Sequence, residues 1–233
     1  QKKLGLGKVP AFDIEAACSG FIYAMEVARG LMLVNNIKHA LVIGAEKLSS
    51  ITNWEDRTTC VLFGDGAGAV VLSQDERENI GILNVLMGAD GSETDILCVP
   101  GGGCATPYTV ETIERSLHKI QMQGNQVFKH AVRVMCQSAI DVVEKAGLTP
   151  ADVDLVVPHQ ANNRIIEALS QRLNIGMEKF KINLDRYGNT SAASIPIALD
   201  EAYRNGRIGP GDNILMVAFG GGLTWAGALV RWQ

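Results

Sequence analysis

Long apolar runs, a basic surface and paired cysteines are all missing from this sequence. No apolar stretch approaches the ~18 residues that a membrane-spanning helix needs, and no signal peptide opens the chain, so we expect no membrane partner. A net charge of −4 argues against nucleic acid as the main partner, because phosphate binding requires a basic face. The five cysteines form no CxxC pair, so we expect neither a disulfide framework nor a metal site, and a reducing cytoplasm is the simplest compartment.

An initiator methionine is also missing, since the chain opens on Gln-Lys-Lys-Leu-Gly. This opening is typical of the middle of a protein, and we therefore expect that an amino-terminal part precedes Gln1. What the 233 residues do contain is 47% hydrophobic residues, enough in composition for a sizeable buried core. The length suits one large domain or two packed smaller ones.

Helical and strand-like patterns alternate along the chain. Apolar residues at helical spacing predict helices after Cys18, after Asn125, around 165–173 and over about 191–203, and Thr149-Pro150 predicts a short one. Short β-like runs predict strands at 40–43, 61–63, 69–72, 80–86, 155–157, 214–219 and 225–230. The first of these suits a strand buried on both faces. Such alternation indicates a layered α/β protein.

Residues 89–124 differ from the rest, because they hold Asp90-Gly91, two prolines and a glycine triplet at 101–103. We predict a long surface excursion here. Loops of this length in compact proteins are usually functional or mobile.

A weak internal repeat relates the two ends of the chain. Helix, strand, glycine turn and strand follow Cys18, and the same order follows Asn189, so that the stretch 63–71 compares with 219–227. If a pseudo-twofold axis relates the halves, Cys18 and Asn189 occupy equivalent positions at two helix starts and meet at one site. We expect residues 1–80 to be the remainder of the first half, with the nucleophile. Residues 81–233 are then the second half, with the histidine and asparagine.

Cys18 lies where a strand-like entry meets a helix start, among small residues. The partial positive charge of a helix amino terminus favours thiolate and lowers a cysteine pKa, and the thiolate is the nucleophile. The same position also suits a small buried hydrophobe with no chemical role.

His159 and Asn189 are the other candidates for chemistry. His159 ends a buried strand, where ligands gather in open α/β sheets, and can exchange a proton near neutral pH; it also suits a structural histidine tied to a loop carbonyl. Asn189 suits a helix N-cap without any function. Asn189-Thr190-Ser191 spells a glycosylation acceptor, which we discount because nothing suggests secretion.

Two glycine-rich stretches invite misinterpretation. Residues 64–69 fit the G-x-G-x-x-G/A spelling, but that nucleotide motif must open a helix and here a β-like run follows, so we reject a Rossmann site. Residues 220–222 suit either a plain turn or a backbone that points an N–H group at a reacting oxygen, as an oxyanion hole requires.

Five segments together carry a family resemblance: AACSGF at 16–21, FGDGAGA at 63–69, VPHQAN at 157–162, GNTSAAS at 188–194 and FGGGLTW at 219–225. In order and spacing they closely resemble β-ketoacyl-[acyl-carrier-protein] synthase III, of the thiolase-like superfamily. The resemblance covers nearly the whole chain. It implies a five-layer α-β-α-β-α sandwich of two similar halves, lacking here the amino-terminal part of the first half, and a homodimer.

The resemblance also implies a Cys-His-Asn triad that initiates type II fatty-acid synthesis by decarboxylative Claisen condensation. Cys18 takes an acyl group, typically acetyl, from coenzyme A, while the backbone N–H groups of Cys18 and Gly221 hold the oxyanion. His159 and Asn189 then hydrogen-bond the thioester carbonyl of malonyl-carrier protein while carbon dioxide leaves, and the resulting carbanion attacks the acyl-cysteine. The coenzyme A thioester is a substrate, and no permanently bound cofactor is implied.

Further positions carry over more loosely. The resemblance implies substrate contacts at Arg57, Phe63, Gly124, Asn125, Phe128 and Asn162. It implies docking of an acidic carrier protein at Lys129, Arg164 and Arg172, although plain solvation also accounts for these charges.

Two departures from the family leave other functions open. The amino-terminal part is absent, and the 89–124 excursion is longer than in some relatives, with an undetermined effect on the acyl pocket. The alternatives are a similar ketosynthase of polyketide, alkyl ketone or quinolone synthesis, and an inactive fragment that acts only in pairing.

Overall fold

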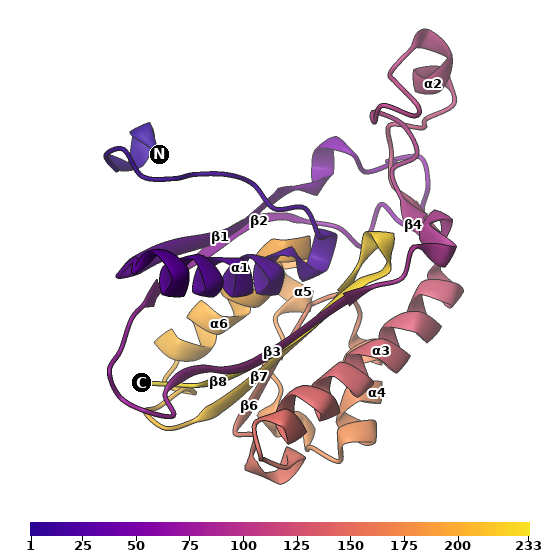
Figure 1. The fold of residues 1–233 in the computed structure, drawn as a ribbon. Coiled ribbons are helices and arrows are strands. Elements are labelled where there is room, and N and C mark those ends of the chain that lie inside the picture. The colour runs from indigo at the N-terminus through magenta and orange to yellow at the C-terminus, as the bar shows by residue number, and fades with distance from the viewer.

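The larger of two main sheets holds four strands in the order β3-β8-β7-β6 in this computed structural model, which describes residues 1–233 (Figure 1). These strands are β3 (Gly81–Ala89), β8 (Thr224–Arg231), β7 (Asn213–Gly220) and β6 (Leu155–Pro158). β6 and β7 are parallel, whereas β8 is antiparallel to both of its neighbours. His159 therefore leaves the sheet at the same edge as the end of β7.

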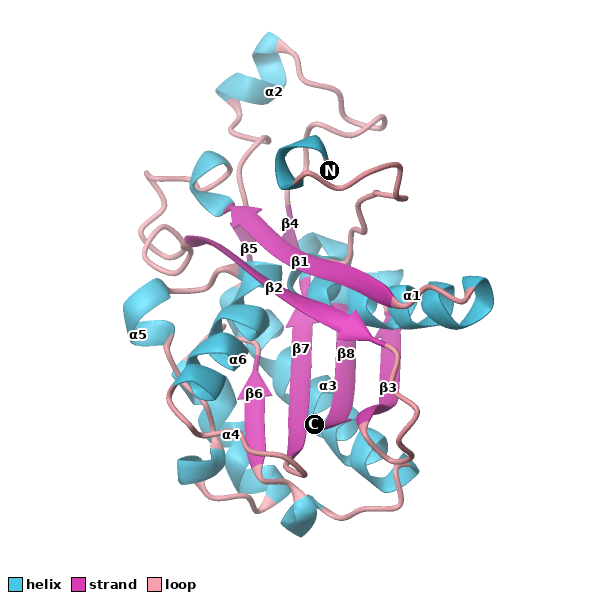
Figure 2. Cartoon of the chain, turned by 90° about the vertical axis from the view of Figure 1, so that its left-hand side faces the viewer, coloured by secondary structure: helices cyan, strands magenta, loops and turns pink.

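Two helix layers cover this sheet. α3 (Gly124–Lys145) and α4 (Asn163–Leu173) lie on one face, and α1 (Gly20–Asn35) and α6 (Ser194–Arg204) lie on the other (Figures 1 and 2). Because β7 is covered on both faces, it is buried along its whole length. Its neighbouring residues Leu215 and Met216 point into two different cores, in agreement with the two-residue period of a strand.

The second main sheet pairs β1 (His39–Lys47) with β2 (Asp65–Ser73) and packs on the far side of α1 and α6. The residues thus form four successive layers: helices, sheet, helices, sheet. On the outer face of this hairpin Leu41, Ile43 and Val71 remain 44%, 50% and 64% exposed. The expectation that the first strand is buried on both faces is therefore wrong for these residues. The division into halves at residue 80, which falls between β2 and β3, stays a prediction.

Strand β2 runs straight through the glycine-rich stretch instead of following it. A β-carbon at Gly66 would lie 2.9 Å from Ile197 Cδ1, and one at Gly68 would lie 2.9 Å from the Ile197 backbone nitrogen. These glycines let α6 approach the strand, and no helix begins at them, so the rejection of a Rossmann site is confirmed. The predicted strand at 61–63 is wrong, because turns fill that stretch and Phe63 makes only an isolated bridge to Asn189.

Helix α1 has the length and mean hydropathy of a membrane span when counted over Ala17–Asn35, which corrects the expectation that no such stretch exists. Its Phe21, Ile22 and Met25 are nonetheless buried against the sheets. A core helix of a soluble protein passes the same test.

The stretch 89–124, predicted to be a surface excursion, carries its own secondary structure. It contains a 3-10 stretch Gly91–Ile96, the short strands β4 (Leu97–Cys98) and β5 (Gln121–Met122), which pair with each other, and α2 (Val110–Glu114). Figure 1 shows α2 standing well away from the layers, whereas β4 lies near the start of α3 and pairs with β5. The base of the excursion therefore borders the carboxyl edge of the sheet. The predicted short helix at Thr149-Pro150 forms as a 3-10 turn, Pro150–Asp152.

Candidate active site

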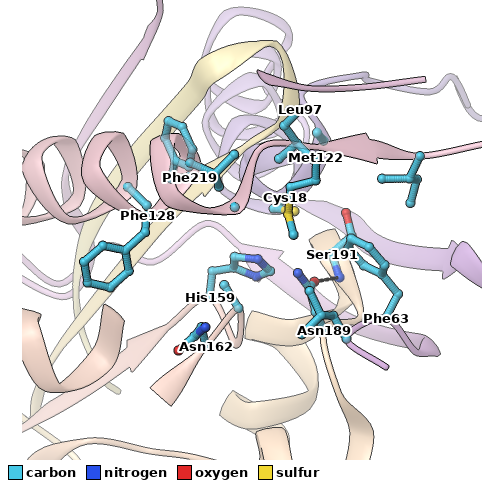
Figure 3. A pocket seen from close by; sticks show the side chains of 18 of the residues that line it. Cys18, Phe63, Leu97, Met122, Phe128, His159, Asn162, Asn189, Ser191 and Phe219 are labelled. Atoms are coloured by element: carbon cyan, nitrogen blue, oxygen red, sulfur yellow. Dashed lines mark hydrogen bonds between the residues drawn. The ribbon is translucent and has the colours of Figure 1, made fainter. Parts of the chain in front are cut away.

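A cavity of about 590 Å³ lies at the carboxyl edge of the larger sheet and brings the three predicted catalytic side chains together. Cys18, His159 and Asn189 all line it, although they come from three distant parts of the chain (Figure 3). Most of the other lining residues are apolar. The cavity therefore combines a few convergent polar groups with an apolar wall, as ligand sites commonly do.

Cys18 sits on a 3-10 turn, Ala17–Ser19, that leads directly into α1. Burial raises the pKa of its thiol to about 11, a nearby Glu46 carboxylate adds to the rise, and a hydrogen bond with the Ser191 side chain opposes it. The pKa is therefore raised where the sequence predicted a lowering, because loss of hydration outweighs the hydrogen bonds that favour the thiolate. The resting side chain at neutral pH is a thiol, not a thiolate.

His159 follows β6 directly, and its backbone N–H donates to the Val217 carbonyl at 2.8 Å. Its ring is 1% exposed, and this burial lowers its pKa to about 4, so it is neutral at pH 7. Nδ1 lies 2.7 Å from the Ser194 hydroxyl. When that hydroxyl donates, Nε2 carries the ring hydrogen and is the nitrogen left to donate to a ligand. The histidine is thus tied to a hydroxyl and not to the loop carbonyl that a purely structural role suggested.

The Asn189 side chain is oriented by the backbone of Ser191. Its Oδ1 accepts the Ser191 N–H at 2.8 Å, which leaves the amide NH2 group as the free end. On its other side, the Asn189 N–H donates to the Leu62 carbonyl at 2.8 Å and its carbonyl accepts the Gly64 N–H at 2.9 Å. Thr190 is the N-cap of the turn that follows, so Asn189 lies one residue before the predicted capping position. It keeps two donor hydrogens for the cavity it lines.

The glycines after β7 pack directly on the turn that holds Cys18. A β-carbon at Gly220 would lie 2.5 Å from the Cys18 backbone nitrogen, so any side chain there would displace the turn. The Thr224 hydroxyl donates to the Ala16 carbonyl at 2.8 Å and fixes the two segments to each other. Gly221 lines the cavity next to Cys18.

The substrate-binding and carrier-protein positions that the resemblance implied divide into two groups. Phe63, Gly124, Asn125, Phe128, Asn162 and Arg164 line the cavity. Arg57, Lys129 and Arg172 are exposed and do not line it, although Arg57 adjoins the lining residue Thr58. The Arg164 guanidinium lies 5.3 Å from the centre of the Phe128 ring, so this charge stands where α3 and α4 meet the cavity.

Sequence reasoning missed several lining or supporting residues. Part of the cavity wall comes from the base of the excursion, with Leu97, Cys98, Ile120 and Met122. Ser194 supports His159 through a hydrogen bond to Nδ1. No spacing in the sequence distinguishes them, because the excursion has no periodic pattern and Ser194 is one of three serines and threonines in its motif. Only the fold places β4 and β5 over Cys18.

Comparisons with known proteins agree along the whole chain. Family models match 3-oxoacyl-[acyl-carrier-protein (ACP)] synthase III over residues 12–91 and its C-terminal part over residues 143–232. β-Ketoacyl-[acyl-carrier-protein] synthase III of Caldanaerobacter subterraneus is 54% identical over 233 residues, which cover 100% of this chain and 70% of the relative. The protein of the same name from Desulfitobacterium hafniense is 53% identical, with 100% and 70% covered.

Solved structures give the same result. The crystal structure of 3-oxoacyl-[acyl-carrier-protein] synthase III from Aquifex aeolicus matches with a TM-score of 0.89 at 50% identity, over 99% of this chain and 70% of that one. That of the Thermus thermophilus synthase III matches with a TM-score of 0.91 at 46% identity, over 100% and 71%. The predicted thiolase-like fold class is therefore confirmed.

Proposed function

Since the chain belongs to the β-ketoacyl-[acyl-carrier-protein] synthase III family, we propose that Cys18, His159 and Asn189 divide its reaction between acyl transfer and decarboxylation. The enzyme is an acyltransferase that carries out the initiating condensation of fatty-acid synthesis. The division of labour among the three residues is the part that we argue from the site.

In the first half-reaction, the Cys18 sulfur attacks the thioester carbonyl of an acyl-CoA such as acetyl-CoA. The backbone N–H groups of Cys18 and Gly221 stabilise the oxyanion that forms, and collapse expels the coenzyme A thiolate. Because burial raises the pKa of the Cys18 thiol to about 11, its proton must leave as the sulfur attacks. That proton ends on the departing thiolate, which leaves acyl-Cys18 and free coenzyme A.

In the second half-reaction, malonyl-carrier protein places its thioester oxygen between His159 and Asn189. Carbon dioxide leaves with one carbon–carbon bond broken, and the electron pair becomes an enolate whose oxygen accepts hydrogen bonds from His159 Nε2 and the Asn189 amide. The enolate carbon then attacks the acyl carbonyl, and Cys18 leaves and regains a proton. Asparagine cannot act as a base, so donation is the role open to it.

The observation that carries this proposal is the orientation of the two donors around one cavity. The Asn189 amide oxygen accepts the Ser191 N–H, and His159 Nδ1 is hydrogen-bonded to the Ser194 hydroxyl. The Asn189 NH2 group and His159 Nε2 are left to donate. Both side chains are buried, with 8% and 1% exposed, so each donor acts where water screens it little. Such preorganised donors stabilise a developing negative charge without first having to reorient.

The substrates and partners extend this proposal. Coenzyme A thioester and malonyl-carrier protein are the substrates, with contacts at the cavity residues Phe63, Gly124, Asn125, Phe128 and Asn162 and at Arg57 beside them. Arg164 marks the cavity mouth for an acidic carrier protein, and exposed Lys129 and Arg172 extend the basic surface. A homodimer in the cytoplasm completes the proposal, as the resemblance implied.

Intact-protein mass spectrometry before and after incubation with acetyl-CoA tests the nucleophile directly. We expect an acetyl-sized gain in the wild type and none in Cys18→Ala. The same gain in both proteins would remove Cys18 from its role. No gain in either protein would count against acyl loading by this chain and so against the proposal.

A further inference from the structure

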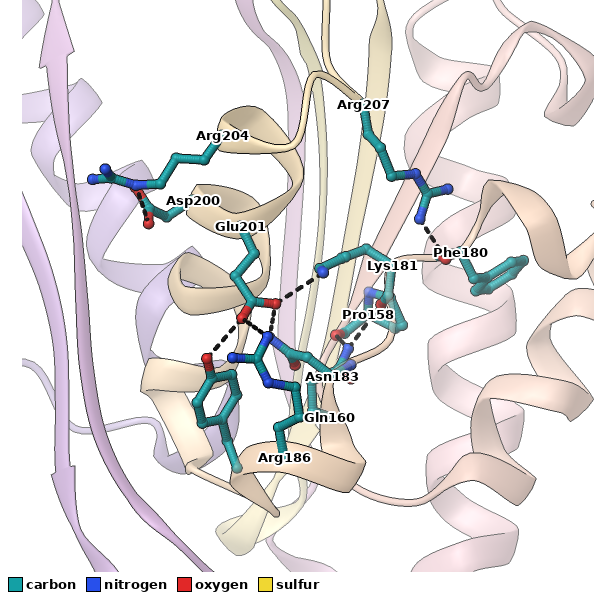
Figure 4. Close-up of polar contacts among 11 residues, drawn as sticks. Pro158, Gln160, Phe180, Lys181, Asn183, Arg186, Asp200, Glu201, Arg204 and Arg207 are labelled. Carbon is teal, nitrogen blue, oxygen red and sulfur yellow. Dashed lines mark hydrogen bonds and ion pairs between the residues drawn. The ribbon is translucent and has the colours of Figure 1, made fainter.

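The carboxylate of Glu201, two turns along α6 from the site, receives four hydrogen bonds from one short segment of the chain (Figure 4). Oε2 accepts from Lys181 Nζ at 2.8 Å and from Asn183 Nδ2 at 3.1 Å. Oε1 accepts from Arg186 Nη1 at 2.8 Å and from the Tyr187 hydroxyl at 2.7 Å. Each oxygen thus holds two donors, and all four donors lie within residues 181–187.

The Glu201 carboxylate and its Lys181 partner are largely buried. The side chains of Glu201 and Lys181 are only 15% and 11% exposed. Burial alone would raise the pKa of Glu201, but hydrogen bonds from Lys181, Tyr187 and Asn183 lower it to about 2. The carboxylate is therefore charged at neutral pH, and it fixes the 181–187 segment to α6.

The segment leads directly to Asn189. α5 (Leu184–Tyr187) ends at Gly188, whose φ of 66° turns the chain toward the cavity. A β-carbon at Gly188 would lie 3.0 Å from the Leu62 carbonyl oxygen, the same oxygen that accepts the Asn189 N–H. Asn189 is thus held by Leu62 on one side and by the anchored α5 turn on the other.

The same segment also supports His159 through the next residue. Gln160 is 1% exposed, and its Nε2 donates to the carbonyls of Pro158 and Lys181 at 2.8 and 3.1 Å. Its Oε1 accepts the Asn183 N–H at 3.0 Å. The buried Gln160 side chain therefore ties the end of β6 to the two residues, Lys181 and Asn183, that Glu201 holds.

Cys18 is supported by different contacts. Its turn packs on Gly220 and is fixed through the hydroxyl of Thr224. A loss at Glu201 therefore reaches His159 and Asn189 by two short routes. It reaches Cys18 one step later, through Ser191, whose N–H holds Asn189 Oδ1 and whose side chain hydrogen-bonds Cys18, so we expect the smaller effect there.

We propose that Glu201 is a positioning residue for decarboxylation, which sets the distance between His159 and Asn189 by anchoring residues 181–187. The proposal rests on the roles given above to His159 and Asn189. Glu201 supports the two donors of the second half-reaction more directly than it supports Cys18, which Gly220 and Thr224 hold in place.

The test measures both half-reactions in Glu201→Gln, which removes the charge but keeps the size. Acetyl loading of Cys18 is followed by intact mass, and decarboxylation by release of carbon dioxide from malonyl-carrier protein. We expect decarboxylation to fall about tenfold to a hundredfold, because misplacement by about 1 Å has that effect, while loading stays within twofold. Asp200→Asn, at the preceding position, breaks only the exposed ion pair with Arg204 and serves as the matched control.

A double-mutant cycle with Asn189→Ala distinguishes positioning from general loss of structure. If Glu201 acts through Asn189 as well as His159, the Glu201→Gln change should reduce decarboxylation by a smaller factor once Asn189 is alanine, because one of its two routes is gone. Full additivity of the two losses, or equal loss of loading and decarboxylation, would overturn the proposal. If Asn189→Ala alone leaves decarboxylation unchanged, the proposed function fails first, whatever Glu201 does.

A second variant covers the case in which Glu201→Gln does not fold, since Lys181 would then be buried without its partner. Tyr187→Phe removes a single hydroxyl from the same carboxylate and leaves the Lys181 ion pair in place. We expect a severalfold loss of decarboxylation with loading unchanged. A Tyr187→Phe protein with wild-type rates in both half-reactions would count against the proposal.

Discussion

The starts of α1 and α6 share one backbone geometry but carry different chemistry. Each helix is preceded by a 3-10 turn of three residues, Ala17–Ser19 and Ser191–Ala193. The first residue of each turn is left-handed although it is not glycine, with φ of 45° at Ala17 and 48° at Ser191. The two turns lie against each other, and a β-carbon at Gly20 would be 3.6 Å from that of Ala192.

This comparison corrects the predicted repeat. When the two turns are aligned residue by residue, Cys18 corresponds to Ala192, and Asn189 corresponds to Glu15. The two turns share their geometry, but Cys18 lies on its turn whereas Asn189 lies before its own. The pseudo-twofold axis itself stays a prediction. One turn presents a thiol, and the other follows a hydrogen-bond donor.

The largest expected effect follows from exchanging the two equivalent positions. Cys18→Ala should lower acyl loading by on the order of 10⁴-fold or more, because the reaction then lacks its nucleophile. Adding Ala192→Cys, which restores a thiol at the equivalent turn, should rescue nothing, since Ala192 does not line the cavity. Intact mass after incubation with acetyl-CoA measures both. An acetylated double variant would mean that the two turns are chemically interchangeable.

The next largest effect concerns the two side-chain donors near the start of α6, His159 and Asn189. His159→Ala and Asn189→Ala should each lower malonyl decarboxylation by about 10²–10³-fold, the usual loss when one such donor is removed. Loading of Cys18 should fall much less, because its oxyanion is held by backbone groups. Separate assays of loading and carbon dioxide release check the split, and equal losses in the two assays would contradict the assigned roles.

His159 is buried against Ser194 at the start of α6, and this burial makes the free energy of unfolding depend on pH. Burial lowers its pKa to about 4, whereas an unfolded histidine titrates near 6.5. Between these values the unfolded chain binds the extra proton, so stability is complete above pH 6.5 and is lost as the pH falls toward 4, by about 3 kcal/mol in all. Urea unfolding at several pH values measures this loss. A His159→Gln variant should lack it, and an identical slope in both proteins would assign the effect to other groups.

The sequence predicted well whatever depends on local pattern and spacing. Strand β6 and the residue that follows it, the apolar stripe of α4 and the three catalytic candidates all lie where residue types predicted them. It failed where the outcome depends on packing between distant segments. The pKa of Cys18 is raised by burial that no local pattern reveals, and β2 continues through Gly66 and Gly68 because α6 packs there. The support that Glu201 gives the 181–187 segment likewise depends on tertiary contacts.

The smallest expected effect concerns the strain that both turns share. A left-handed residue with a side chain costs roughly 1–2 kcal/mol, and glycine removes that cost while it adds about 0.5–1 kcal/mol of unfolded-state entropy. Ala17→Gly should therefore leave the free energy of unfolding unchanged or raise it by up to about 1.5 kcal/mol. Ala28→Gly in the interior of α1 should lower it by about 1 kcal/mol. Urea unfolding compares the two, and equal destabilisation by both would mean that the left-handed turn at Ala17 stores no strain.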